Sequence, residues 1–112
     1  MIKALRYEEH STVDIEADNI CLRNESNLPF TERCYISLDK WEAVKTFIDK
    51  DILFSDLWYK KYYLVIFSGI NILFINDSNI KNRETCAITL DKWEKVKTFI
   101  DEQIKLKNNA TK

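Results

Sequence analysis

The feature that most constrains this chain is an internal duplication with an offset of 52 residues. The stretch 36–49 reads ISLDKWEAVKTFID, and it returns at 88–101 as ITLDKWEKVKTFID. No gap is needed from residue 5 onward, and 23 of the 48 residue pairs from 5/57 to 52/104 are identical. A unit of this size buries little surface alone, so the two copies are predicted to fold against each other. We expect one domain made of a first unit at 1–52 and a second at 53–106, with a polar tail at 107–112.

The most similar part of each copy predicts a strand followed by a helix. Cys34, Ile36 and Leu38 recur at every second position, as in a half-buried strand, and their counterparts do the same 52 residues later. Apolar residues then recur at intervals of three or four, which predicts one apolar stripe on each helix. These residues are Trp41, Val44, Ile48 and Ile52 in the first copy and Trp93, Val96, Ile100 and Ile104 in the second.

Acidic residues mark the start of each predicted helix. Asp39 and Asp91 are suited to cap the free backbone amides of the first turn. A glutamate three residues later, Glu42 or Glu94, completes a capping-box pattern. The shared carboxylates farther along the predicted helices, Asp49 and Asp101, are expected to be solvated on the outer helix faces.

The first part of each copy predicts two further strands. Apolar and polar residues alternate from Leu5 to Glu16, so a long strand there would bury one face and expose the other. Turn-forming residues at 17–19 and 69–71 then lead into a shorter strand in each copy. The predicted fold class is therefore α+β. It is a tandem duplication of a β-β-β-α unit, with an antiparallel sheet or sheets and two helices packed on one side.

The two copies differ most on the sheet face that should point outward. This face is polar in the first copy and largely apolar in the second. A continuous apolar patch is unusual on the surface of a monomer. It would pack against the other copy or an identical subunit, or it would dock another macromolecule through aromatic anchors. The residues that we assign to this partner-binding face are Trp58, Lys60, Tyr62, Leu64, Ile66, Leu73 and Ile75.

Charge and composition narrow the classes of function. The first 52 residues carry 7 basic and 11 acidic side chains and the rest carry 10 and 7, which gives −4 and +3 and a net charge of −1. This balance does not predict a strongly basic nucleic-acid surface. The apolar run 62–75 is too short to span a bilayer, so no membrane contact is expected. Three cysteines without paired spacing favour free thiols in a reducing cytoplasm.

The sequence carries no recognisable catalytic, cofactor or metal motif. His10 and Cys21 would share the polar face of the first copy, which raises the possibility of a Cys-His nucleophile. Their counterparts are Tyr62 and Leu73, and no third orienting group is evident. One histidine and three scattered cysteines do not have the spacing of metal ligands. Gly69 is the only glycine, which excludes a glycine-rich phosphate loop. We therefore predict a non-enzymatic protein with no cofactor.

The strand-to-helix end of each copy resembles the positive cofactor four family of single-stranded-DNA-binding coactivators. The resemblance rests on Ile36-Ser37-Leu38 followed by Trp41 and the stripe of Val44 and Ile48. It implies a curved antiparallel sheet before one helix, and a dimer that the duplication would mimic in one chain. The sequence differs from the family in the closer spacing of Leu and Trp, in three predicted strands instead of four, and in few basic sheet residues. No site residues are transferred from it.

These observations together predict a small binding protein. Abundant Ile, Lys and Asn suggest an AT-rich genome, so we expect a phage or mobile-element protein that acts as an inhibitor or adaptor. It would dock a protein partner, or associate with itself, through the partner-binding face. The alternative is a pseudo-dimeric single-stranded nucleic-acid-binding protein similar to the positive cofactor four family. In that case Trp58 and Tyr62 would stack on bases beside Lys60 and Lys61.

Overall fold

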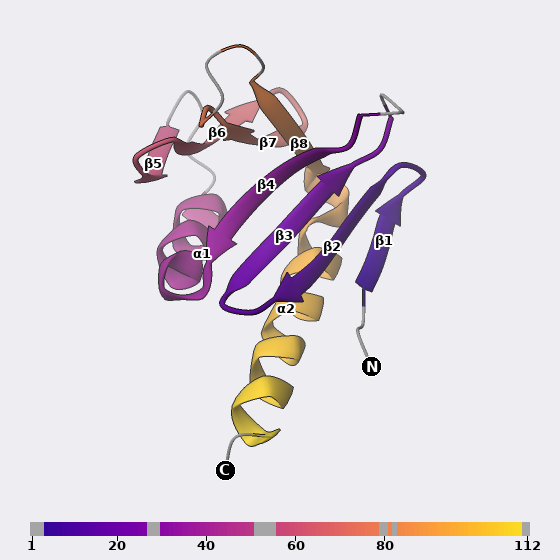
Figure 1. Ribbon diagram of the computed structural model, residues 1–112, viewed down its shortest axis with the longest axis vertical. Coiled ribbons are helices and arrows are strands. Elements are labelled where there is room, and N and C mark those ends of the chain that lie inside the picture. Colours follow the sequence, from indigo (N-terminus) through magenta and orange to yellow (C-terminus); the bar gives the residue numbers. More distant parts are fainter. Residues whose placement is uncertain (1–3, 27–29, 51–55, 79–80, 82, 111–112) are drawn as a thin grey trace.

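Each copy folds into four antiparallel strands followed by a helix (Figure 1). The computed structural model describes residues 4–26, 30–50, 56–78, 81 and 83–110. The first sheet has the order β1-β2-β3-β4, and its strands are Ala4–Glu8, Ser11–Glu16, Asn19–Asn24 and Glu32–Ser37. The second sheet has the order β5-β6-β7-β8, and its strands are Asp56–Lys60, Tyr63–Ser68, Asn71–Asn76 and Glu84–Thr89. A 3-10 turn, η1 (Leu38–Lys40), leads into α1 (Trp41–Lys50), and α2 spans Leu90–Ala110.

The α+β class, the duplication and the two helices are confirmed, but each unit has four strands where the sequence predicted three. The predicted long first strand is a hairpin in both copies. It turns at Glu9-His10 in the first copy and at Lys61-Tyr62 in the second. Neither turn contains Gly, Pro, Asn or Asp, the residues that usually identify a turn in a sequence. The alternation of apolar and polar residues therefore continues through both turns, and the sequence does not indicate where the chain turns.

A β-bulge in the first strand of each sheet turns a tyrosine toward the other copy. The pairing register shifts near the end of β1 and of β5, and a bulge of this kind re-aims the side chain of its extra residue. That residue is Tyr7 in β1 and Tyr59 in β5, and both side chains are buried. Tyr7 Oη donates a hydrogen bond to the Ala87 carbonyl at 3.1 Å, and Tyr59 Oη donates to the Tyr35 carbonyl at 3.0 Å. Burial raises the pKa of both phenols.

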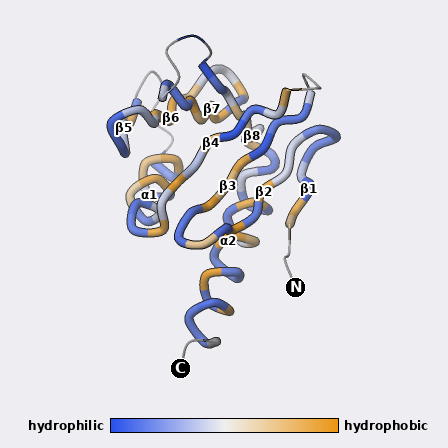
Figure 2. Tube along the Cα trace, viewed as in Figure 1, coloured by the Kyte–Doolittle hydropathy of each residue, from blue (hydrophilic) through white to orange (hydrophobic). Residues whose placement is uncertain are grey.

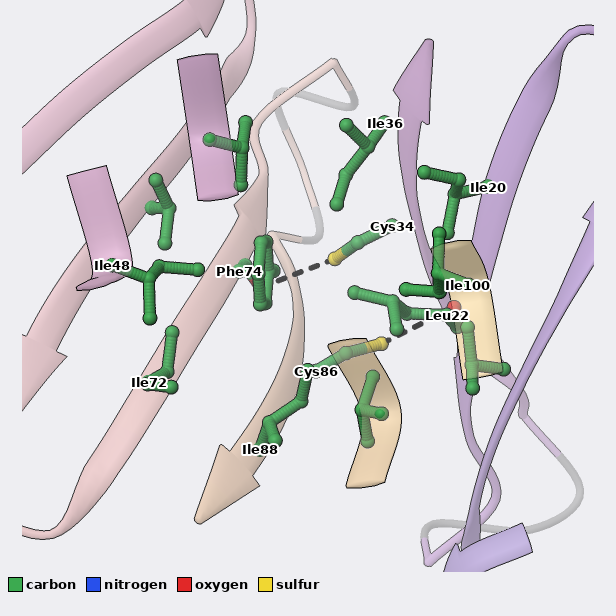
Figure 3. Packing of buried hydrophobic residues seen from close by; sticks show 14 of the residues in the cluster. Ile20, Leu22, Cys34, Ile36, Ile48, Ile72, Phe74, Cys86, Ile88 and Ile100 are labelled. Carbon is green, nitrogen blue, oxygen red and sulfur yellow. Dashed lines mark hydrogen bonds between the residues drawn. The ribbon is translucent and has the colours of Figure 1, made fainter. Parts of the chain in front are cut away.

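The inner faces of the two sheets share one hydrophobic core, in which β4 contacts β7 and β8 (Figure 3). Cys34 and Cys86 occupy equivalent places in it and are free and buried, as the sequence predicted. Cys34 Sγ donates to the Phe74 carbonyl at 3.1 Å, and Cys86 Sγ donates to the Leu22 carbonyl at 3.4 Å. The Cys34 thiol and burial raise the pKa of Cys86. Both side chains therefore act as small core groups.

Polar side chains satisfy backbone groups where the last strands of the two sheets pass each other. Glu84 Oε2 accepts a hydrogen bond from the Arg33 amide at 2.7 Å, and Glu32 Oε2 accepts one from the Thr85 amide at 3.0 Å. Asn76 Nδ2 donates to the Arg33 carbonyl at 3.0 Å, and its counterpart in the first copy donates to the Thr85 carbonyl. An unpaired strand edge exposes backbone donors and acceptors. Each copy thus completes the sheet edge of the other.

Each helix also packs across the boundary between the copies. α1 contacts β5, whereas α2 contacts β1 and β2 as well as β8. Figure 1 shows α2 behind the first sheet and extending beyond it. This helix continues to Ala110, into the region predicted to be a polar tail. There Lys107 Nζ donates to the Ala17 carbonyl and lies 3.4 Å from the Asp18 carboxylate.

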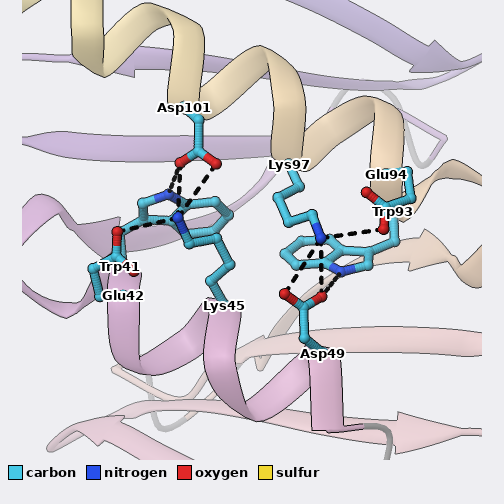
Figure 4. A network of polar contacts seen from close by, with 8 residues as sticks. All are labelled: Trp41, Glu42, Lys45, Asp49, Trp93, Glu94, Lys97 and Asp101. Carbon is cyan, nitrogen blue, oxygen red and sulfur yellow. Dashed lines mark hydrogen bonds and ion pairs between the residues drawn. The ribbon is translucent and has the colours of Figure 1, made fainter.

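A symmetric set of polar contacts joins the two helices, and we name it the helix clamp (Figure 4). Its members are Trp41, Lys45 and Asp101 on one side and Trp93, Lys97 and Asp49 on the other. In each half the indole Nε1 donates to the aspartate at 2.8 Å, and the lysine Nζ lies 3.1 Å from the same oxygen. The two indole rings meet edge to face with their centroids 5.8 Å apart.

The clamp corrects the roles that the sequence predicted for the shared carboxylates. Asp49 and Asp101 are partly exposed, but each also accepts two donors from the other helix, a role that the sequence did not predict. Asp39 lies inside η1 and not at its N-cap, and Asp91 lies in the first turn of α2. Glu42 pairs with Lys45 at 3.1 Å, three residues along the same helix. A carboxylate in the first turn still favours the helix through the helix dipole.

Candidate partner-binding face

The second sheet presents two apolar rows on its outer face. Strand pairing places Trp58, Leu64 and Ile75 in one row and Ile66 and Leu73 in the next. Trp58 is 52% exposed, whereas Leu64, Ile66 and Leu73 are half-buried. Figure 2 shows the hydrophobic character of β6 and β7, on which most of these residues lie. These four side chains thus form an accessible surface and are not part of the interior.

Three of the seven predicted residues are placed differently from the other four. Ile75 shares the row of Leu64 but is only 6% exposed, so little of its side chain is accessible to a partner. Tyr62 lies in the β5–β6 turn and is 44% exposed, with Lys61 Nζ 5.2 Å from its ring centroid. Lys60 follows the bulge of β5 and pairs with Tyr63, so it leaves the row of Trp58. The bulge, which the sequence did not reveal, causes this change of place.

The same face of the first sheet carries a network of charged side chains. Arg23 Nη1 lies 2.7 Å from Asp14 Oδ1, and Arg23 also pairs with Glu16. Asp14 is buried, and although burial alone would lower the pKa of Arg23, the hydrogen bond to Asp14 raises it. The counterparts of Asp14 and Arg23 in the second copy are Ile66 and Ile75. The fold therefore accepts either an ion-pair network or apolar side chains at these positions.

The structure does not bring Cys21 and His10 together as a nucleophile and its base. His10 lies in the exposed β1–β2 turn, next to the end of β3 at Asn24. Cys21 lies three residues along β3, roughly 10 Å away at the rise of a strand. The Cys21 side chain is fully buried, and burial raises the pKa of its thiol to about 11. The thiolate that nucleophilic catalysis needs is thus disfavoured.

A small groove that the sequence did not predict lies where β4 of the first sheet meets the β5–β6 hairpin of the second. We name it the junction groove, and it has a volume of about 210 Å³. Its lining residues are Asn19, Tyr35, Ser37, Lys60 and Tyr63. The groove joins residues from both copies, so only knowledge of how the sheets meet could locate it. One sequence signal was present, since position 60 is Lys where the first copy has Glu8.

No protein-family model, curated protein or solved structure matches this chain. Among the described residues, none of the helices is long and apolar enough to cross a membrane. In the same part of the chain, no three His, Cys, Asp or Glu side chains gather as metal ligands would. The partner-binding face is therefore the feature of the molecule from which a function can be inferred.

Proposed function

We propose that this chain is a non-enzymatic binding protein, an inhibitor or adaptor that docks a protein partner through its second sheet. The contact surface consists of Trp58, Tyr62, Leu64, Ile66 and Leu73. Exposed aromatic residues surrounded by aliphatic ones are the usual anchors of protein interfaces. Lys61 lies at its edge and would complement acidic groups on the partner.

The observation that carries this proposal is the contrast between the two sheets. They share a strand order, a bulge and an inner core, yet the first has Asp14, Cys21 and Arg23 where the second has apolar residues. The first sheet shows that the scaffold does not need apolar side chains on this face. On the second sheet such side chains lower the solubility of the chain and are not needed for the fold. Their burial against a partner accounts for their presence.

A matched pair of variants tests the proposal. Leu64→Glu places a charge in the apolar surface, and Thr12→Glu places one at the equivalent, equally half-buried position of the first sheet. The partner should be captured from host extract by the parent chain and by Thr12→Glu, but not by Leu64→Glu. Sedimentation velocity on the same three proteins tests self-association, which Leu64→Glu should abolish if the partner is a second copy. If all three proteins are monomeric and capture the same set of proteins, the proposal is wrong.

Single-stranded nucleic acid is the second candidate partner, and one observation favours it. Tyr62 and Trp58 are the two most exposed aromatic side chains of the second sheet, and Lys61 lies over the ring of Tyr62. Exposed rings beside cations can stack on unpaired bases. The four strands before each helix also remove one of the three differences from the positive cofactor four family.

The tryptophans allow a direct test of this second candidate. Trp41 and Trp93 are buried, so quenching of fluorescence by a bound oligonucleotide would report on Trp58. Binding through phosphates should weaken steeply as salt rises. Trp58→Phe should remove the quenching, and Lys61→Ala should weaken binding. Unchanged fluorescence and anisotropy at low salt would exclude this candidate.

A further inference from the structure

We propose that the partner on the second sheet is a second copy of this chain, docked face to face across a two-fold axis along the row of Trp58 and Leu64. This inference rests on the proposed function, because it names the occupant of the same partner-binding face. The result is a symmetric dimer in which the Lys61 ammonium of each copy pairs with the Asp56 carboxylate of the other.

The first observation is that two opposite charges lie on either side of this row at equal distances from it. Asp56 pairs with Ile66, two positions along β6 from Leu64. The β5–β6 turn, Lys61-Tyr62, lies two positions from Leu64 in the opposite direction. At the rise of a strand each charged residue is thus roughly 7 Å from the row. A rotation of 180° about the row exchanges the two places, so Asp56 of one copy faces Lys61 of the other.

Neither charge has an ionic partner within one copy. Asp56 and Lys61 are exposed, and neither forms an ion pair in the part of the chain that the structure describes. They lie roughly 13 Å apart along the strands, which is too far for a direct pair. Lys61 Nζ lies instead 5.2 Å from the ring centroid of Tyr62, at the end of the apolar rows. The dimer supplies both missing partners and forms two ion pairs.

The apolar residues lie where the same axis brings apolar groups together. Leu64 lies on the axis and would contact Leu64 of the other copy, and Ile66 would lie over Tyr62. Two sheets that pack face to face lie about 10 Å apart, with their strand directions within about 30° of each other. A rotation about an axis perpendicular to the strands keeps the strands aligned, so it satisfies this geometry.

The first sheet lacks this self-complementary pattern. The counterparts of Asp56, Lys61 and Leu64 are Ala4, Glu9 and Thr12. A rotation about the equivalent row would place Glu9 opposite Ala4, so the ion pair of the second sheet has no equivalent there. The chain therefore has one self-complementary sheet face, and a two-fold contact through it closes a dimer without forming filaments.

The size of the second sheet sets the expected affinity. Four strands of five or six residues cover roughly 19 by 20 Å, or about 400 Å² in projection. A standard protein interface buries about 800 Å² of accessible surface on each partner. The dimer should therefore be weak, with a dissociation constant on the order of 10–100 μM.

Sedimentation velocity of the whole chain between about 10 μM and 1 mM covers this range of affinity. The parent chain and Thr12→Glu should change from monomer to dimer as the concentration rises. Leu64→Glu should stay monomeric, because it brings two like charges together on the axis. Lys61→Glu and Asp56→Lys should each weaken the dimer by roughly tenfold, since each substitution occurs twice and turns attraction into repulsion. Circular dichroism of each variant confirms that it is folded.

An equal mixture of Lys61→Glu and Asp56→Lys gives the most specific test. Each variant repels itself, but a mixed dimer has Asp56 against Lys61 at one end and the introduced Glu and Lys at the other. The mixture should therefore associate within about threefold of the parent chain. Association by apolar contact alone, without the two-fold arrangement, would not be restored by mixing.

Three results would overturn the dimer. A parent chain that stays monomeric at about 1 mM would exclude it. If Leu64→Glu then still abolished the capture of a host protein, the proposed function would stand with another occupant. A mixture that associates no better than either single variant would refute the two-fold arrangement. Equal association of Leu64→Glu and Thr12→Glu would place the contact elsewhere and contradict the proposed dimer.

Discussion

The helix clamp holds the two copies together through Asp49 and Asp101, and replacement of either aspartate should therefore destabilise the fold. Asp101→Ala takes away the acceptor of the Trp41 indole N–H at 2.8 Å and the partner of Lys45 at 3.1 Å. Trp41 is 2% exposed, so its N–H loses its partner in a site that water does not reach easily. Asp49→Ala does the same to Trp93 on the other side.

The expected loss of unfolding free energy depends on how exposed each group of the clamp is. A buried donor left without a partner costs roughly 1–3 kcal/mol. The ion pair adds little, because the Asp101 side chain is 43% exposed and solvent screens it, so we assign it about 0.5 kcal/mol. Each alanine variant should thus lose about 2 kcal/mol, a large share of the stability of a domain of this size. Asp101→Asn keeps an oxygen acceptor for the indole and should lose only about 0.5–1 kcal/mol.

Urea unfolding monitored by circular dichroism measures these differences. The urea concentration at the unfolding midpoint should fall. The slope of the unfolding free energy against urea concentration should stay constant, because the surface exposed on unfolding is unchanged. Glu42→Ala is the control, since its side chain is 80% exposed and contributes only to a surface pair. A loss below about 0.5 kcal/mol for Asp101→Ala, or an equal loss for the alanine and asparagine variants, would refute the assigned role of the indole hydrogen bond.

Three further predictions concern single positions. Ala17 has a left-handed φ of 53° where the second copy has Gly69 at 61°, so Ala17→Gly should stabilise the fold by up to about 1 kcal/mol. Gly69→Ala should destabilise it by a similar amount through backbone strain alone, because the added Cβ would meet nothing within 4 Å. The urea midpoints of the two variants measure both changes. Burial would raise the pKa of Asp49, but the hydrogen bonds from Trp93 and Lys97 outweigh it and lower the pKa. The stability this adds is present above the unfolded pKa near 3.8 and is lost as the pH falls through the folded value, so Asp49→Asn should show a weaker loss of thermal stability below about pH 4. Cys21 is buried with a pKa of about 11, so in the folded chain it should react with iodoacetamide far more slowly than in urea, as mass spectrometry of timed samples would show; equal rates would contradict its burial.

The helices and the duplication could be predicted because they depend on local pattern. Val44 and Ile48 lie on the stripe that the sequence indicated, and both are buried, as are Val96 and Ile100. The spacing of apolar side chains along a helix needs no knowledge of what the helix packs against. Because the two copies are nearly identical over this stretch, the same helix could be predicted in both.

The helix clamp could not be predicted for a physical reason. Lys45 and Asp49 are four residues apart, and this spacing is also that of an ordinary ion pair within one helix. The sequence alone does not show that the contacts cross to the other helix. The junction groove was hidden in a similar way, because Ser37 and Lys60 meet only through the arrangement of the two sheets.

The hairpin at the start of each copy was missed because its turn residues are not typical of turns. Most residues of the predicted partner-binding face lie on the outer side of the second sheet. Alternation located them, because outward and inward residues alternate along any strand. The bulge in β5 then moved Lys60 into the groove, and Ile75 proved to be buried. Both exceptions arise from irregular pairing or local packing, which alternation alone does not encode.

The distribution of identical residues between the copies follows from the symmetry of the contacts. Among the described residues, seven pairs of side chains make equivalent hydrogen bonds to the other copy, and both members of every pair are identical. These are positions 7/59, 24/76, 32/84, 34/86, 41/93, 45/97 and 49/101. A contact that is made twice requires the same chemistry twice. Within the part of the chain that the structure describes, the outer sheet faces and the pair 8/60 make no such reciprocal contact, and there the copies differ. The identical pairs therefore describe the scaffold, and the differing positions locate the surfaces at which a duplicated scaffold is free to acquire a partner.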